Sequence, residues 1–233
     1  MPRETPADRI AKLIRCAAQV FIAQGYRRTQ MADVAAALGV AKGTLYLYVE
    51  SKEALFDLVT RYSDVPAPLI GAPVLPIQTP KPGQTLRYVR ERLAANRAPQ
   101  ALLKALSGRP AADTRAELEA IVGELYDLLG RNRVGIKLID SSARDVPELA
   151  ALWFDGARMG LLGLLTEYLT DRIRRKRLRP APDVAVAARL IIETLVFWAV
   201  HRHWDAAPQA VTDEAARKTA VHFVVSALAK DGR

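Results

Sequence analysis

Basic and hydroxyl side chains gather in one short segment of the chain, VAKGTLYLYVESKEAL, residues 40–55. The amines of Lys42 and Lys52 and the hydroxyls of Thr44, Tyr46 and Tyr48 lie here with only a few apolar residues between them. A helix that serves only a core does not need these groups, whereas a helix that enters a DNA groove does. Lysine can donate to guanine O6 or N7, and the threonine hydroxyl and methyl can contact base edges. The segment therefore favours nucleic-acid readout.

The apolar spacing in this segment predicts which side faces the bases. Leu45 and Val49 are four residues apart, so on a helix both point toward the protein. The outward arc near the helix N-terminus, where a recognition helix meets base edges, then holds Lys42, Gly43, Thr44, Tyr46 and Leu47. Gly43 leaves room for the backbone to come close, and Leu47 can pack on thymine methyl groups.

A second set of side chains is expected to contact phosphates. These contacts position a protein on DNA without reading its sequence. The set comprises Thr29, Gln30, Tyr46, Tyr48 and Lys52. Spacing alone leaves another interpretation open, in which two small helices pack in a core and the lysines are solvated.

The chain before and after this segment predicts short helices, as a helix-turn-helix motif requires. Residues 5–25 predict a first helix, with Thr5 as its cap, Pro6 in its first turn and Gly25 at its end. A second helix starts at Thr29 and ends at Gly39. A tight turn at Val40 and Ala41 leads into a third helix over KGTLYLYV, residues 42–49, and a fourth covers residues 52–62. Two short helices joined by a glycine-containing turn are what a helix-turn-helix motif requires.

From Leu13 to Leu58 the sequence resembles the DNA-binding domain of the TetR family of bacterial transcriptional regulators. The matching residues are Ala17, Phe21, Gly25, Tyr26, Thr29, Asp33, Val34, Ala35, Gly39, Val40, Lys42–Tyr46, Tyr48, Ser51, Lys52, Glu53 and Leu55. The resemblance implies DNA contacts by Thr44, Tyr46, Tyr48 and Lys52, and variable reading positions at Lys42, Gly43 and Leu47. Ala41, Gln30 and Val49 depart from the pattern, which expects a capping Ser, a Thr and a Phe there.

The rest of the chain predicts an all-α protein with two domains. Six of the fourteen prolines fall at 66, 68, 73, 76, 80 and 82, a density that excludes a regular helix. We expect a helix-turn-helix domain over 1–62, a proline-rich connection over 63–83, and a helical ligand-binding and dimerisation domain over 84–233. Helices are expected at 84–97, 99–107, 113–130, 133–141, 147–177, 183–204 and 212–229.

Composition narrows the function classes. The net charge of +9 favours an anionic partner, and the single cysteine, Cys16, indicates a reducing cytoplasm. His201 and His203 are two residues apart, so on a helix they point in nearly opposite directions and do not chelate one metal. We expect no metal, no cofactor, no membrane span and no enzyme activity.

The resemblance also implies how the rest of the protein works. It implies a homodimer, formed through the helices at 147–177 and 183–204, that binds a palindromic DNA operator and is released by a small effector. The broad apolar face of 183–204 agrees with burial on two sides. A repressor is the first interpretation. An activator on the same fold, or a ligand-binding dimer that no longer binds DNA, stays open as an alternative.

The effector pocket has few sequence signals. Aromatic side chains on the candidate pocket helices are Tyr88, Tyr126, Trp153 and Phe154. Trp153 and Phe154 are adjacent, so they cannot share one helix face. These residues predict a mainly apolar pocket and a hydrophobic ligand, and ordinary core packing remains open for each.

Overall fold

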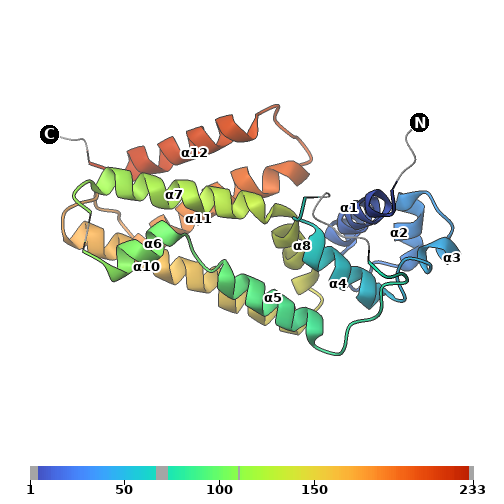
Figure 1. The fold of residues 1–233 in the computed structure, drawn as a ribbon. Coiled ribbons are helices and arrows are strands. Elements are labelled where there is room, and N and C mark those ends of the chain that lie inside the picture. Colours follow the sequence, from blue (N-terminus) through green and yellow to red (C-terminus); the bar gives the residue numbers. More distant parts are fainter. Residues whose placement is uncertain (1–4, 67–72, 110, 231–233) are drawn as a thin grey trace. The chain divides into compact units, whose positions relative to one another are not determined.

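The computed structural model describes residues 5–66, 73–109 and 111–230 and shows an all-α protein (Figure 1). Within these residues the extended pairing is limited to two isolated bridges, Val49 with Ile77 and Leu178 with Ala229. The chain forms two compact units. The first comprises residues 1–93 and 134–153, and the second comprises 94–133 and 154–233. The boundaries expected at residues 62 and 83 stay a prediction.

The first unit contains seven helices, counted over the residues described. They are α1 (Pro6–Gln24), α2 (Met31–Leu38), α3 (Lys42–Leu45), α4 (Lys52–Tyr62), α5 (Gln84–Ala95), α8 (Arg133–Ala143) and α9 (Pro147–Ala150), although α5 and α8 each have one end in the second unit. The predicted start of α1 is confirmed, because the Thr5 hydroxyl accepts from the Asp8 amide and Asp8 accepts from the Thr5 amide.

The core of the first unit comes from the predicted apolar stripes. Leu13 and Phe21 of α1, Val34 of α2 and Leu55 of α4 are fully buried. The rings of Phe21 and Phe56 meet edge to face with centroids 5.2 Å apart, and Tyr26 completes the cluster. Hydrophobic burial thus packs α1, α2 and α4 into one support for α3.

The described parts of the proline-rich connection, residues 63–66 and 73–83, have no helix, as predicted, and Pro68 lies outside the described residues. Residues 73–83 are nevertheless hydrogen-bonded to the rest of the first unit. The Ile77 amide donates to the Tyr48 carbonyl over 2.8 Å, and the Glu50 amide donates to the Ile77 carbonyl over 3.0 Å. We call residues 76–79 the clamp segment.

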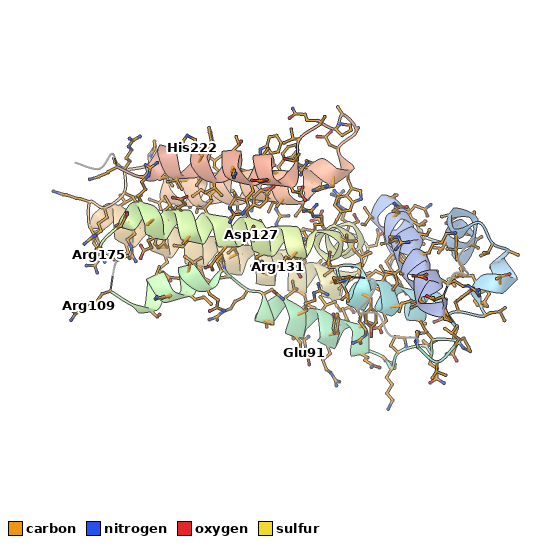
Figure 2. All side chains as sticks on the ribbon, turned by 45° about the horizontal axis from the view of Figure 1, so that its top comes forward. Glu91, Arg109, Asp127, Arg131, Arg175 and His222 are labelled. Carbon is orange, nitrogen blue, oxygen red and sulfur yellow. The ribbon has the colours of Figure 1, made fainter. Side chains whose placement is uncertain are left out.

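The second unit is a bundle of helices. They are α6 (Gln100–Ser107), α7 (Thr114–Arg131), α10 (Met159–Arg174), α11 (Val184–Ala199) and α12 (Asp213–Leu228). α7, α11 and α12 lie side by side in Figure 1, and α10 packs on α11 and α6. Figure 2 labels Asp127 on α7 and His222 on α12; Asp127 accepts two hydrogen bonds from Arg217 of α12.

Two predicted long helices change pitch or end early. The expected helix over 147–177 consists of α9, a π-helical segment (Ala151–Arg158) and α10, which ends at Arg174. The expected helix over 183–204 stops at Ala199, because Val200 leaves helical geometry at φ −122° and ψ −68°, and a short 3₁₀ turn (His201–Trp204) follows. Hydrophobic periodicity does not distinguish these local changes of pitch.

Arg172, in the last turn of α10, is a charged side chain that lies inside the second unit. It is 2% exposed and donates to both carboxylate oxygens of Glu117, at 2.8 and 3.1 Å, and to the Ala105 carbonyl at 2.9 Å. The Tyr168 hydroxyl donates to the same carboxylate over 3.1 Å. This ionic network ties α6, α7 and α10 together inside the second unit.

Candidate nucleic-acid interface

The helix-turn-helix of the first unit is built from α2, a tight turn and α3. Gly39 ends α2 in the left-handed region at φ 76°, where glycine is favoured. Its amide donates to the carbonyls of Ala35 and Ala36. The chain then turns through Val40 and Ala41 into α3. Ala41 provides no side-chain cap, in agreement with the departure noted from the sequence.

α3 is shorter than the sequence predicts, but its faces are as expected. Regular α-helix covers only Lys42–Leu45, and Leu47 and Tyr48 then donate to the carbonyls three residues before them, at 3.1 and 3.0 Å. The helix therefore tightens toward 3₁₀ geometry at its end. Leu45 and Val49 are completely buried.

The outward arc of this segment is open to solvent. Lys42, Gly43 and Tyr46 are exposed, Thr44 is half-buried, and Leu47 is 68% exposed. A Cβ placed on Gly43 would meet nothing within 4 Å, so the protein itself does not require glycine there. The structure thus leaves a basic and hydroxyl-bearing surface beside an exposed leucine that contributes nothing to the core.

Thr29 lies inside the unit, although the sequence placed it among the phosphate contacts. Its side chain is 2% exposed, and its hydroxyl donates to the Gly25 carbonyl over 2.8 Å. The hydroxyl therefore closes the turn after α1. Thr29 positions the start of α2, and its hydroxyl does not reach the surface in this structure.

Lys52 also has a structural task that the sequence did not reveal. Its ammonium donates to the carbonyls of Tyr26, Arg27 and Thr29 at 3.2, 3.3 and 3.2 Å. It also lies 4.7 Å from the centroid of the Tyr26 ring. These three bonds use all three donors of the ammonium. Lys52 therefore holds the turn between α1 and α2 against the start of α4.

Gln30 and Tyr48 lie at the two ends of the helix-turn-helix. Gln30 is exposed, and its backbone amide donates to the Asp33 carboxylate of α2 over 2.9 Å. Tyr48 is half-buried, and its carbonyl accepts from the clamp segment. Both side chains lie next to exposed positions, and their predicted phosphate contacts stay predictions.

Tyr26, which the sequence only matched as a family position, is coupled to α4. Its hydroxyl donates to the Glu53 carboxylate over 3.0 Å. Burial, followed by this hydrogen bond to a carboxylate, raises the pKa of Tyr26 well above its ordinary value. The phenol is therefore kept protonated as a donor, and the turn after α1 is held by both Tyr26 and Lys52.

Sequence reasoning missed two further anchors of this unit. Asp64, just after α4, accepts from the amides of Val134 and Gly135 at 2.9 Å each and so caps the start of α8. Glu50 accepts from the Thr79 amide over 2.8 Å. Both are charged residues in loops, and their roles become clear only from their hydrogen bonds to residues far away along the chain.

The four predicted pocket residues have separate local partners. Tyr88 and Trp153 belong to the first unit, where Tyr88 donates to the Arg61 carbonyl and Trp153 to Asp140, at 3.3 and 3.0 Å. Tyr126 and Phe154 belong to the second. Tyr126 is buried and donates to the Trp198 carbonyl over 3.1 Å. Neither unit by itself brings the four together, and their role in effector binding stays a prediction.

A groove in the second unit lies elsewhere. It has a volume of about 560 Å³ and is lined by residues near α6 and α10, among them Arg97, Leu103, Lys104, Leu164 and Glu167. None of the four predicted pocket residues lines it. In the described part of the chain, no group of three or more His, Cys, Asp or Glu side chains could hold a metal ion.

The fold and the exposed arc define the class: an all-α protein with an N-terminal helix-turn-helix. Residues 13–59 match the family model for bacterial regulatory proteins of the tetR family. This N-terminal part of the chain is thus similar to the tetR family, as its residues predicted.

Solved structures agree on the fold. The ketosteroid transcriptional regulator KstR2 of Mycobacterium tuberculosis is 17% identical, with a TM-score of 0.57 and coverage of 96% of each chain. AibR, solved in complex with isovaleryl coenzyme A and operator DNA, is 19% identical, with a TM-score of 0.51 and coverage of 92% of this chain and 97% of its own. No curated protein matches the chain.

One continuous helical stretch, Pro147–Arg174, is long and apolar enough by length and composition to cross a membrane, although only 11% of its most apolar window is buried. Core helices of soluble proteins meet the same criterion, and this single stretch is weak evidence. The expected cytoplasmic location stays a prediction.

Proposed function

We propose that the protein is a homodimeric transcriptional repressor that binds a palindromic operator through α3 and is released by a small, mainly apolar effector. The observation that carries this proposal is the division of the α3 segment. Leu45 and Val49 are buried, while Lys42, Gly43, Tyr46 and Leu47 face solvent. The exposed donors can bond to base edges, and the exposed leucine beside them can pack on thymine methyl groups.

Base reading is assigned to Lys42, Thr44 and Leu47, with the Gly43 backbone approaching the groove. Phosphate binding is assigned to Gln30, Tyr46 and Tyr48, at the edges of the groove. Thr29 and Lys52 support this surface from behind through the Gly25–Gln30 turn. For Thr29 and Lys52 we therefore propose a positioning role in place of the phosphate contacts expected from the sequence.

A dimer is supported by apolar side chains left exposed on α10 and α11. On α11, Val186, Leu190 and Phe197 are exposed, while Ile191 and Leu195 on the opposite face pack inside the second unit. On α10, Met159 is exposed, and Gly160 and Gly163 have open space around them. Two such faces can cover each other in an isologous interface, which places one recognition helix on each half of a palindrome.

The proposed effector is hydrophobic and acts by favouring a dimer geometry that does not fit the operator. One protein of similar fold was solved with isovaleryl coenzyme A. Acyl-coenzyme A thioesters of increasing chain length are therefore the first probes for this proposal, with coenzyme A alone as the control.

The decisive experiment selects binding sites from random duplexes at low salt with the purified full-length protein. The expected result is an enriched site with two inverted halves, which Tyr46→Ala and Lys42→Ala bind more weakly. Absence of any enriched site would overturn the proposal and favour a ligand-binding dimer that no longer binds DNA. Transcription in vitro from a promoter that carries the selected site separates a repressor from an activator.

A further inference from the structure

The clamp segment, residues 76–79, holds the end of the recognition helix from outside the helix-turn-helix. The Ile77 amide donates to the Tyr48 carbonyl, and the Glu50 amide donates back to the Ile77 carbonyl, as in one rung of a parallel sheet. These bonds satisfy a carbonyl and an amide in the turn between α3 and α4. That turn connects the end of α3 to the start of α4.

Side chains add two further contacts between the same segments. The Glu50 carboxylate accepts from the Thr79 amide over 2.8 Å, and the hydroxyls of Ser51 and Thr79 lie 2.7 Å apart. Ser51 also accepts from the Ala54 amide and so caps α4. The clamp segment thus joins the end of the recognition helix and the start of α4 at one place.

The clamp segment continues directly into α5. The Gln84 amide donates to the Lys81 carbonyl, the Gln84 side chain accepts from the Lys81 amide, and α5 starts at Gln84. α5 is itself fixed to α4, because Thr85 donates to Asp57 over 2.8 Å and the Arg61 guanidinium lies 4.4 Å from the Tyr88 ring centroid. A shift of α5 would therefore act on α4 and on the recognition helix together.

We propose that the clamp segment is a positioning element for DNA recognition, and that Glu50 and Thr79 set the orientation of α3 without contacting bases. This inference rests on the proposed function. Losing a clamp bond lets α3 take several orientations, so the base contacts are weakened while the surface charge that attracts any DNA remains. Specific binding should fall more than non-specific binding.

The test compares Glu50→Ala with Glu50→Gln in the full-length protein. Both remove the negative charge, but only glutamine keeps an oxygen that can accept from the Thr79 amide. Glu50→Ala should weaken binding to the selected operator about fivefold, the factor that one hydrogen bond of about 1 kcal/mol supplies. It should leave the affinity for a scrambled duplex at the level of Glu50→Gln.

Further variants separate clamping from general damage. Thr79→Val removes the hydroxyl contact with Ser51 and should also lower the ratio of operator to scrambled affinity. Gln78→Ala changes an exposed side chain between the clamp bonds and should match the wild type. Amide hydrogen exchange should show faster exchange at Glu50 and Thr79 in Glu50→Ala than in Glu50→Gln.

The outcomes are distinguishable from failure of the proposed function. If the wild type selects no duplex, the repressor proposal itself fails. If the wild type binds its operator and Glu50→Ala equals Glu50→Gln in the ratio of operator to scrambled affinity, the clamp inference is wrong and the proposed function stands. A reduced ratio with unchanged helical circular dichroism supports the inference.

Discussion

The two lysines of the recognition region have different tasks although the sequence gives them similar surroundings. Lys42 is exposed on α3, whereas the ammonium of Lys52 donates to three carbonyls of the turn after α1. A charged donor shared by three carbonyls stabilises a turn more than a solvated lysine does. Chemistry at this scale depends on the partner atoms, which residue type alone does not specify.

A matched pair of substitutions tests this difference. Lys52→Met should lower the free energy of unfolding by about 1–2 kcal/mol, because three hydrogen bonds from a charged group are lost while the apolar stem is kept. Lys42→Met should leave stability unchanged and weaken operator binding. Urea unfolding and operator affinity are measured for both. Equal stability of the two variants would contradict the structural role of Lys52.

At the scale of elements, most helices could be predicted because caps and apolar periodicity act locally. Thr5, Asp113 and Asp183 each accept from an amide three residues on, as short-range signals foretell. The π-helical segment at Ala151–Arg158 could not be predicted, because hydrophobic periodicity does not distinguish a local change of pitch. The burial of Arg172 could not be predicted either, because its partner lies far away along the chain. Glu117, which makes Arg172 tolerable inside the unit, is 55 residues away.

The pair of Arg172 and Glu117 predicts a large effect of truncating one partner. Glu117→Ala leaves the buried Arg172 guanidinium with the Asp171 carboxylate but without that of Glu117, and should cost about 3 kcal/mol of stability. Replacing both partners with apolar residues, Glu117→Leu and Arg172→Met, should cost less than Glu117→Ala alone. Urea unfolding measures all three proteins. A more stable single than double variant would contradict this account of the pair.

The same network predicts a loss of stability in acid. Burial alone would raise the pKa of Glu117, but hydrogen bonds from Arg172 and the Ala111 amide lower it overall. Hydrogen bonds from Arg175, Arg174 and Arg172 lower the pKa of Asp171 to about 2. Since both carboxyls bind protons more readily when unfolded, their stabilisation is present above about pH 5 and falls as the pH decreases toward these pKa values.

Unfolding in urea at pH 7, 5 and 3 checks this direction. The wild type should lose stability between pH 5 and 3, and Glu117→Gln should lose less over the same interval because one titrating group is removed. Other carboxyls add to both proteins equally, so the difference between the two is the measured quantity. Identical pH dependence in the two proteins would remove Glu117 from the explanation.

At the scale of the whole molecule, the exposed apolar face of α11 is the clearest sign of association. Leu190 is 62% exposed on this face, and Phe223 on α12 is 66% exposed. Isolated exposed residues are ordinary, but Val186, Leu190 and Phe197 repeat along one helix. The sequence predicted a broad apolar helix; which side packs inside its own unit became known only from the structure.

Leu190→Arg should convert the proposed dimer to monomers, because it would bury an unpaired charge between two copies. Operator binding should fall with it, since one recognition helix alone holds only half of a palindrome. Phe223→Arg is the matched control and should leave the dimer intact. Sedimentation measures the mass of each variant. Monomers from Phe223→Arg and not from Leu190→Arg would move the interface to α12.

The pairing of Val49 with Ile77 matters for a hybrid protein in which this helix-turn-helix is joined to another ligand-binding domain. A graft joined after Tyr62 would carry all four N-terminal helices but leave the Tyr48 carbonyl and the Glu50 amide without Ile77. A graft joined after Pro82 would bring these partners along. The transplantable module therefore includes the clamp segment, which forms no helix, and hybrid proteins cut at the two places should differ in operator binding.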